Sequence, residues 1–308
     1  MFMEVYLTFD DGIQAGTEEV LEVLRETGVK ATFFLIGNEL RYSYEQAPSR
    51  LLALLKEIYD HHDIGNHSYS HANFRYANYY LNNGVQICNR GGWRSILADF
   101  EKGQDQIDEY LKMANGPSGN RKNIRIARFP GRNTFHTFSS VPNKCGANGL
   151  YRYEEKTKER AKELADAGYN IFGWDVGWEM SFEFHRDAIA LKKLNENTTT
   201  FDYGNEKDVY PCLDMYCTRN IQKDRLIEDW PSVINKIEKK AAQRDKVILL
   251  MHDRAFRRGI HDGNPDAYES SNSEARKLWL LITQLKAMQA DFKGLADYWQ
   301  GTSFASAG

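Results

Sequence analysis

Short apolar or β-branched runs alternate with longer amphipathic runs along this chain of 308 residues. Because parallel strands are connected by helical crossovers, the alternation predicts an α/β fold, either a barrel or a doubly wound sheet. Strands are predicted at Val5–Phe9, Ala31–Ile36, Ile64–Gly65, Ile124–Arg128, Tyr169–Trp174 and Val247–Met251. Helices are predicted at Thr17–Thr27, Leu51–Tyr59, Arg94–Met113, Lys156–Ala167, Pro231–Arg244 and Ser273–Gln289.

The composition is that of a globular protein and argues against nucleic acid or a membrane as its partner. Hydrophobic residues make up 42% of the chain and charged residues 27%, which is ordinary for a protein with a sizeable core. The 40 Lys and Arg residues nearly balance the 43 Asp and Glu residues, so the net charge of −3 offers no basic surface. The longest apolar runs, such as Val247–Met251, are far shorter than the roughly 18 residues of a membrane helix. We therefore expect a soluble chain with a small or uncharged partner and no membrane span.

The N-terminus and the cysteines bear on the compartment. The strand-like run Val5–Phe9 begins too early to leave room for a signal region, so either the protein is cytoplasmic or a leader has been removed. Cys88, Cys145, Cys212 and Cys217 lie in polar stretches, which favours a secreted or periplasmic protein with disulfides over one with buried thiols. We predict that Cys212 pairs with Cys217, five residues away, and that Cys88 pairs with Cys145. Four reduced thiols remain the alternative.

The first predicted strand ends in two adjacent carboxylates, those of Asp10 and Asp11, followed by Gly12. In parallel α/β folds the carboxyl ends of the strands carry the active-site groups. Two neighbouring acids repel each other unless a positive group joins them. Taken alone, however, Asp-Gly is also ordinary turn chemistry.

Two histidines, His67 and His71, follow the short predicted strand Ile64–Gly65. Four residues apart, they would lie on one face of a helix and suit one divalent metal. Imidazole, carboxylate and an open position together make a hydrolytic metal site, most simply for zinc or a neighbouring first-row ion. Such a histidine pair alone is more often a surface feature. The interpretation as metal ligands is strengthened because Asp10 and Asp11 end another strand.

With these two segments and three later ones, the sequence resembles the polysaccharide deacetylases of carbohydrate esterase family 4, the NodB-homology family. Five short segments occur in the family's order between Thr8 and His252. The resemblance implies a distorted (β/α) barrel with long rim loops, formed by a single catalytic domain over residues 1–308. Loop insertions are expected at about 76–92 and 179–225, where periodicity is lost.

The first two segments carry the metal site of the family. The first Asp of the Thr-Phe-Asp-Asp-Gly segment acts as general base in the family and the second binds the metal, which implies these roles for Asp10 and Asp11. Both histidines of the His-Ser/Thr-x-x-His segment are family ligands, which implies His67 and His71. The implied cofactor is a divalent metal, most simply Zn²⁺, with Co²⁺ able to substitute.

The third segment runs Arg-Phe-Pro-Gly-Arg from Arg128 to Arg132, where the family has Arg-x-Pro, an aromatic residue and Gly. The resemblance implies that Arg128 orients the base and that the backbone N–H of Gly131 binds the oxyanion. Gly131 stands where the family has Tyr or Phe, so one wall of the acetyl pocket lacks its ring. A backbone donor needs no side chain, and the oxyanion role therefore survives.

The last two segments supply the remaining site residues. Gly-Trp-Asp-Val-Gly-Trp resembles the Trp-Asp-Val form of the family's fourth segment, with Gly177 in place of a second Asp. It implies a catalytic role for Asp175, as the carboxylate that keeps an imidazole charged, and substrate binding by Trp178. Leu-Met-His matches the family's Leu-x-His, which implies substrate contact by Leu250 and a general acid in His252.

The resemblance implies hydrolytic removal of N-acetyl groups from N-acetylglucosamine-containing glycans, with release of acetate. It is strongest to bacterial chitin-oligosaccharide deacetylases, so the implied partner is an acetylated amino-sugar oligosaccharide, and we expect a monomer. The segments Tyr76–Gly92 and Glu179–Arg225 follow catalytic segments and should wall the groove, which favours short oligomers. Three alternatives stay open: a deacetylase of peptidoglycan, xylan or exopolysaccharide, another metal-dependent amide hydrolase on a barrel, and a carbohydrate-binding relative that has lost turnover.

Overall fold

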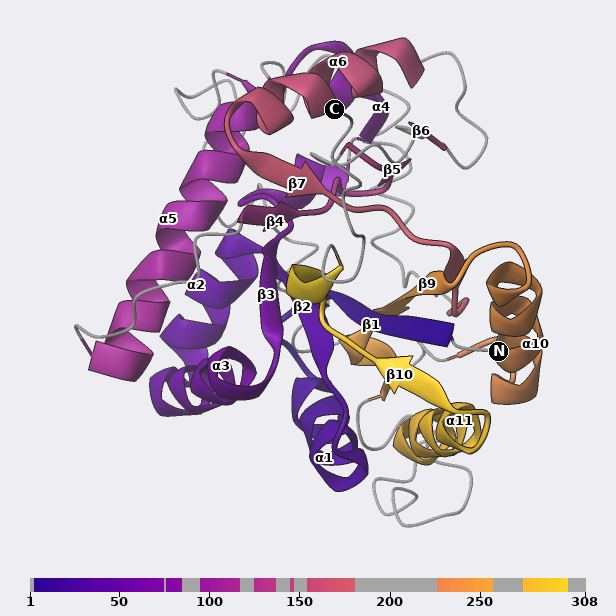
Figure 1. Ribbon diagram of the computed structural model, residues 1–308. Coiled ribbons are helices and arrows are strands. Elements are labelled where there is room, and N and C mark those ends of the chain that lie inside the picture. Colours follow the sequence, from indigo (N-terminus) through magenta and orange to yellow (C-terminus); the bar gives the residue numbers. More distant parts are fainter. Residues whose placement is uncertain are drawn as a thin grey trace, which may run out of the picture.

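A curled sheet with helices on its outer face forms the computed structural model of the chain (Figure 1). The structure describes residues 3–74, 76–84, 95–116, 125–136, 145–146, 154–180, 226–256 and 274–298. Within these residues the sheet has eight strands in the order β7-β4-β3-β2-β1-β9-β8, and β10 also pairs with β1. All of its strand pairs are parallel. The predicted α/β fold with a distorted barrel is therefore confirmed.

The strands of this sheet are β1 (Met3–Gly12), β2 (Ala31–Leu35), β3 (Asp63–Asn66), β4 (Arg125–Ala127), β7 (Tyr169–Ile171), β8 (Val176–Gly177), β9 (Lys246–His252) and β10 (Ala290–Phe292). A separate antiparallel pair consists of β5 (Asn133–Thr134) and β6 (Cys145–Gly146). The α-helices are α1 (Thr17–Thr27), α2 (Gly37–Gln46), α3 (Pro48–His61), α4 (Tyr76–Leu81), α5 (Ile96–Asn115), α6 (Glu154–Asp166), α10 (Trp230–Ala241) and α11 (Glu274–Ala287). Three short 3₁₀ helices are η1 (His71–Phe74), η6 (Asp253–Phe256) and η8 (Leu295–Asp297).

Each predicted strand and helix forms close to its expected place, but the expected loop at 76–92 is wrong in its first part. Residues 76–81 form helix α4 instead, a single short element whose period is too brief to read from sequence. Residues 85–94 and 181–225 lie outside the described part of the chain, so the rim-loop insertions remain predictions. The same holds for the cysteine pairs, because Cys88, Cys212 and Cys217 are outside it.

Side chains of β1 alternate between two apolar cores. Val5, Leu7 and Phe9 pack in the large cluster between the sheet and the helices. Tyr6 packs in a smaller cluster inside the barrel. Because successive side chains of a strand point to opposite faces, Thr8 and Asp10 lie on the same inner face as Tyr6. The inner face thus begins with an apolar floor and ends with polar groups at the carboxyl end of the strand.

The two sheet edges, β7 and β8, are joined by the chain itself. Residues 172–175 cross from one edge to the other and are held by side chains from the neighbouring segment. Asn133 donates from Nδ2 to Trp174 O at 2.9 Å and accepts the Trp174 N–H at 2.8 Å. Arg128 donates to the carbonyl oxygens of Phe172 and Gly173 at 3.1 and 2.9 Å. Hydrogen bonds from side chains therefore close the side of the barrel that strand pairing leaves open.

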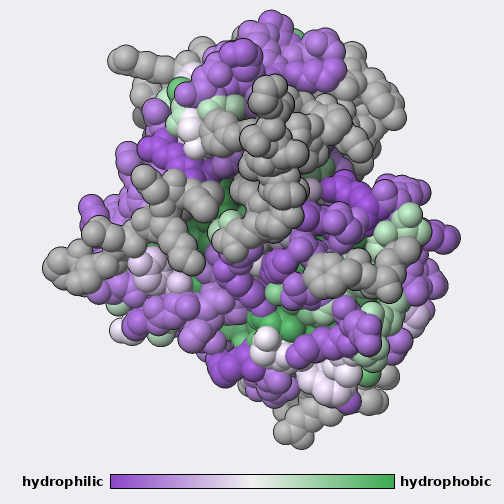
Figure 2. Space-filling view, in the orientation of Figure 1, coloured by the Kyte–Doolittle hydropathy of each residue, from purple (hydrophilic) through white to green (hydrophobic). Residues whose placement is uncertain are grey.

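The visible surface of the described residues is mostly hydrophilic, with hydrophobic residues in small areas between them (Figure 2). Leu81, Met113 and Ile227 are the large hydrophobic residues that the described part exposes. Among the described helices, none has the length and apolar character needed to cross a bilayer. Buried apolar residues of the described part pack in three clusters.

Truncation of the barrel interior should weaken the fold strongly. Ile248 is fully buried in the inner cluster, so we expect Ile248→Ala to lower the free energy of unfolding by about 2–5 kcal/mol through lost contacts and a cavity. Ile227 is 62% exposed, and the matched change Ile227→Ala should stay within about 0.5 kcal/mol of the parent chain. Denaturant unfolding of both variants measures this, and equal losses would contradict the assignment of Ile248 to the core.

Candidate active site and metal centre

Asp10 and Asp11 reach the same site because β1 is irregular at its end. Alternation alone would point neighbouring side chains to opposite faces of the strand. However, Asp11 has a left-handed φ of 74°, and the pairing with β2 shifts register between Asp10 and Gly12. As a result, His67 Nε2 lies 3.6 Å from Asp10 Oδ2 and 3.5 Å from Asp11 Oδ1.

The segment from His67 to His71 is not the helix that the four-residue spacing suggested. After β3 the chain is irregular, and only at His71 does the 3₁₀ helix η1 begin. Ser68 and His71 adopt left-handed φ values of 66° and 49°, and these turns bring both rings to one point. His71 Nε2 lies 3.2 Å from Asp11 Oδ1. The two rings converge as predicted, but through turns and not through a helix face.

A buried carboxylate on α5, that of Asp99, supports this segment. Its Oδ1 accepts the Ser70 N–H at 3.0 Å, and its Oδ2 accepts the hydroxyls of Ser70 and Tyr79, each at 2.7 Å. Asn66 adds a second support, because its Oδ1 accepts the Ser68 N–H at 2.8 Å. Neither residue was predicted. The available signal was a carboxylate among the apolar positions of an amphipathic helix, which does not reveal its partner.

Asp11, His67 and His71 form a ligand set that fits a divalent metal. Their ligand atoms lie within 4.8 Å of one another, and all three residues are buried. His67 Nδ1 lies 2.8 Å from the carbonyl oxygen of Arg128, which can only accept, so Nδ1 carries the proton and Nε2 presents its lone pair. Asp11 Oδ1 accepts no hydrogen bond from the described residues, as expected of an oxygen reserved for a metal.

The protonation states of this set also suit a metal. Burial by itself raises the pKa of Asp11, but His71 and the Arg254 guanidinium outweigh it and hold the pKa of this carboxyl below its ordinary value. Burial lowers the pKa of His71 to about 3, so its ring is neutral near pH 7. An ionised carboxylate with a neutral imidazole is what metal binding requires.

Arg128 lies fully buried beside Asp10. Its Nη1 donates to Asp10 Oδ1 and to Thr8 Oγ1, both at 2.8 Å. Its guanidinium also stacks over the ring of Phe34, with 4.2 Å from Cζ to the ring centre. The contact between Arg128 and Asp10 is the one that the resemblance implied. It fixes one oxygen of the carboxylate and leaves Oδ2 on the side of His67.

His252 ends β9 directly opposite Asp10, its partner in the strand register. Its Nε2 lies 3.9 Å from Asp11 Oδ2. Burial lowers the pKa of His252 to about 4, and Asp11 offsets this only in part. The ring is therefore neutral near pH 7, in contrast to the charged imidazole expected with a carboxylate partner.

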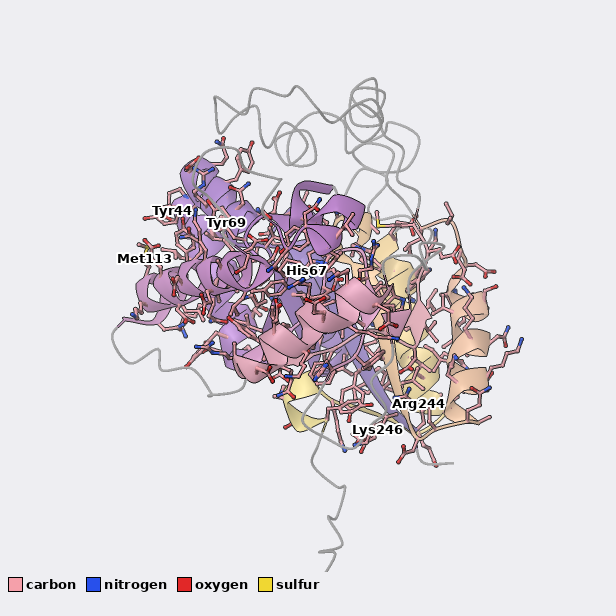
Figure 3. The ribbon with its side chains drawn as sticks, turned by 90° about the horizontal axis from the view of Figure 1, so that it is seen from above. Tyr44, His67, Tyr69, Met113, Arg244 and Lys246 are labelled. Atoms are coloured by element: carbon pink, nitrogen blue, oxygen red, sulfur yellow. The ribbon has the colours of Figure 1, made fainter. Side chains whose placement is uncertain are left out.

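The expected pairing of Asp175 with His252 is wrong. Asp175 Oδ1 accepts from Arg244 at 2.7 Å, and its Oδ2 accepts the Ile248 N–H at 2.9 Å, four residues before His252 on β9. In Figure 3, His67 lies in the middle of the molecule and Arg244 at its edge, which places Asp175 at the far end of the barrel. Gly177 pairs with Leu250, nearer to His252, but has no side chain to offer.

The predicted substrate-binding residues divide into two groups. Trp178 is only 2% exposed, donates its indole N–H to Glu228 O and packs against Phe256, so it is a core residue and not a sugar platform. Leu250 is half-buried and lies on the same face of β9 as His252. Gly131 lies exposed in a turn with a φ of 62° directly after Pro130.

Two charged residues directly after His252 also belong to the site. Arg254 Nη1 lies 2.6 Å from Asp11 Oδ2. Asp253 is fully buried and accepts from Gln14 Nε2 at 2.9 Å and Thr17 Oγ1 at 2.5 Å, while burial raises its pKa to about 7. A Cβ on Gly12 would lie 2.5 Å from Asp253 Oδ2, which explains the glycine after Asp11. The sequence feature that could have pointed to Asp253 and Arg254 is their position directly after an apolar strand that ends in His.

Comparison with known proteins gives related sequences in one family. Residues 3–150 match the sequence profile of the family described as polysaccharide deacetylase. A chitin disaccharide deacetylase of Vibrio alginolyticus is 26% identical over 295 residues, covering 83% of this chain and 63% of that protein. A chitooligosaccharide deacetylase of Azorhizobium caulinodans is 35% identical over 114 residues, covering 33% of this chain and 50% of that protein. The chain therefore spans less than two thirds of the length of either relative.

A solved structure shares the fold. A Streptococcus mutans CE4 esterase superposes with a TM-score of 0.51 at 18% identity, covering 95% of this chain and 86% of that one. The profile match includes the segments that carry Asp10, Asp11, His67 and His71. Residues 3–150 thus match the polysaccharide deacetylase family, and the chain shares its fold with a CE4 esterase.

Proposed function

We propose that this protein is a metal-dependent deacetylase that hydrolyses the N-acetyl groups of N-acetylglucosamine-containing glycans and releases acetate. The observation that carries the proposal is the convergence of Asp10, Asp11, His67, His71 and His252 at the carboxyl ends of parallel strands. The names of both related deacetylases support an acetylated amino-sugar substrate, and short chitin oligosaccharides are the proposed preference.

Asp11, His67 and His71 would hold the metal, with Zn²⁺ as the proposed ion and Co²⁺ as a substitute. When bound, such an ion polarises the acetyl carbonyl and lowers the pKa of a bound water from about 15.7 towards 7. Three protein ligands leave positions open for both. All three residues are buried, so bulk water weakens their electrostatic attraction to an ion less than it would at the surface.

Asp10 is the proposed general base. Arg128 Nη1 donates to Asp10 Oδ1 and to Thr8 Oγ1, each at 2.8 Å, and Asp10 Oδ2 stays on the side of His67. Oδ2 is therefore the oxygen that takes the proton of the attacking water. The backbone N–H of Gly131, in the turn just after Arg128, is the proposed donor to the oxyanion.

His252 is the proposed general acid, and its proton must arrive during turnover. The resting ring is neutral near pH 7 because burial lowers its pKa to about 4. A neutral imidazole that gave up its remaining proton would become an anion, so we infer that the proton taken from water by Asp10 passes on to His252, which then delivers it to the leaving amine. Leu250, on the same face of β9, is proposed to contact the acetyl group.

The domain organisation, the oligomeric state and the location of the protein are also proposals. We propose that residues 1–308 form one catalytic domain that works as a monomer. The cysteine pattern supports a secreted or periplasmic location with Cys212 paired to Cys217 and Cys88 to Cys145. Removal of acetyl groups from peptidoglycan, xylan or exopolysaccharide would require the same catalytic residues. These glycans are therefore included as substrates in the test of specificity.

Removal of the metal should abolish activity. Chelation followed by dialysis is expected to leave an inactive protein, because the remaining groups supply no electrophile for the carbonyl. Addition of Zn²⁺ or Co²⁺ should restore turnover. Acetate release is measured beside elemental analysis of the same samples, and full turnover by a metal-free preparation would overturn the mechanism.

Substitution of the base and the acid should separate chemistry from metal binding. Asp10→Asn and His252→Ala should each lower kcat by at least about 10²-fold while the metal stays bound. Asp60→Asn and His61→Ala, at the exposed end of α3, are the matched controls and should keep the parent rate. If the Asp10 variant loses its metal, the roles of Asp10 and Asp11 are exchanged.

If Asp99 holds the segment that carries the histidine ligands, its replacement should lower the metal affinity. Asp99→Ala removes the acceptor of three hydrogen bonds to Ser70 and Tyr79, so we expect metal binding to weaken by about 10- to 100-fold. Asp105→Ala, on an exposed position of the same helix, is the control. Titration with a competing chromophoric chelator gives both dissociation constants, and equal values would show that Asp99 does not hold the loop.

The preferred length of the substrate should depend on whether the insertions predicted at 76–92 and 179–225 wall the groove. If they wall the groove, the N,N′-diacetyl disaccharide and short oligomers should be deacetylated faster than colloidal chitin. Mass spectrometry of the products measures initial rates on each, with acetylated xylan and peptidoglycan in parallel. Faster turnover of the insoluble polymer would mean that the site is open.

A further inference from the structure

The two oxygens of Asp11 have different neighbours. Oδ1 faces the rings, with 3.2 Å to His71 Nε2 and 3.5 Å to His67 Nε2. Oδ2 lies 2.6 Å from Arg254 Nη1. Both Asp11 and Arg254 are buried, at 5% and 3% exposure, so solvent does not screen the contact. One oxygen is thus directed to the ligand set and the other to a fixed cation.

Arg254 is held in place by the segment that contains it. It lies in the 3₁₀ helix η6, next to Asp253, which is fully buried and accepts hydrogen bonds from Gln14, just before α1, and from Thr17, the first residue of α1. The ends of β1 and β9 are also in register, with Asp10 opposite His252. The backbone on both sides of the contact between Asp11 and Arg254 is therefore anchored independently of the contact itself.

A carboxylate can bind a metal through one oxygen or through both. Binding through both would use a position that a hydrolytic centre with three protein ligands needs to keep open. A guanidinium stays charged at any working pH and donates in a fixed plane, so it can withhold one oxygen from the metal. We propose that Arg254 is a positioning residue of the metal centre, which holds Asp11 Oδ2 so that Oδ1 alone is offered to the ion. This inference rests on the proposed metal site.

Two physical effects of Arg254 on metal affinity have opposite signs. Coulomb repulsion between the guanidinium and the ion weakens binding, so its removal alone would tighten binding. Fixing the ligand strengthens binding, and loss of such an outer partner typically costs about 10- to 100-fold in metal affinity. The sign of the change therefore distinguishes a positioning residue from a bystander charge.

The test compares metal binding in Arg254→Met and Arg254→Gln, which are both neutral, with that of the parent chain. Circular dichroism selects the variants that fold, and Arg254→Lys serves as the conservative rescue. Arg244→Met is the matched control, because Arg244 also pairs with an aspartate, Asp175, at 2.7 Å but at the far end of the barrel. Dissociation constants come from chelator competition after metal removal, and the visible absorption of the Co²⁺ form reports coordination number.

We expect the neutral variants to bind Co²⁺ and Zn²⁺ about 10- to 100-fold more weakly than the parent. Their Co²⁺ absorption should weaken as Asp11 binds through both oxygens, and the lysine variant should recover part of the affinity. Arg244→Met should match the parent in both measurements. Unchanged or tighter binding in the neutral variants, with an unchanged spectrum, would overturn the role of Arg254 while leaving the metal site intact. A parent chain that binds neither ion would instead overturn the proposed function.

Discussion

A fully buried guanidinium, that of Arg128, links the closure of the barrel to the candidate site. A buried charge is tolerated only when it is paired and hydrogen-bonded. Arg128 meets this demand with Asp10 on one side and the carbonyl oxygens of Phe172 and Gly173 on the other. The same side chain therefore spans from β1 to the segment that joins the two sheet edges. Its backbone carbonyl also fixes the tautomer of His67, so three parts of the site depend on one residue.

The positions of Asp10, Asp11, His67 and His252 were predictable because each follows an apolar run. Parallel strands end at one edge of the sheet, so polar residues after such runs must come together. Only the local route differed: a helix was expected at His67 and His71, but left-handed turns bring them together. A sequence pattern thus determines where chemistry gathers more securely than how the backbone arranges it.

Other parts of the site depend on contacts that no local pattern encodes. Asp175 lies in a motif-like segment, yet its place at the far end of the barrel follows from the register of β8 against β9. Trp178 is buried because Phe256, far along the chain, packs on it. Asp99 and Arg254 act through partners that are distant in sequence. Their residue types suggested charge, but only the tertiary structure shows what each charge meets.

The pairing of Arg128 with Asp10 and of Arg254 with Asp11 has a consequence for how the protein matures. Two carboxylates are balanced by two guanidiniums before any ion is present. Domains whose ligands have no such counter-charges must gain their metal in order to fold. Here the cost of burying the acids is already offset within the chain, so folding of the barrel does not depend on an ion at the proposed metal site.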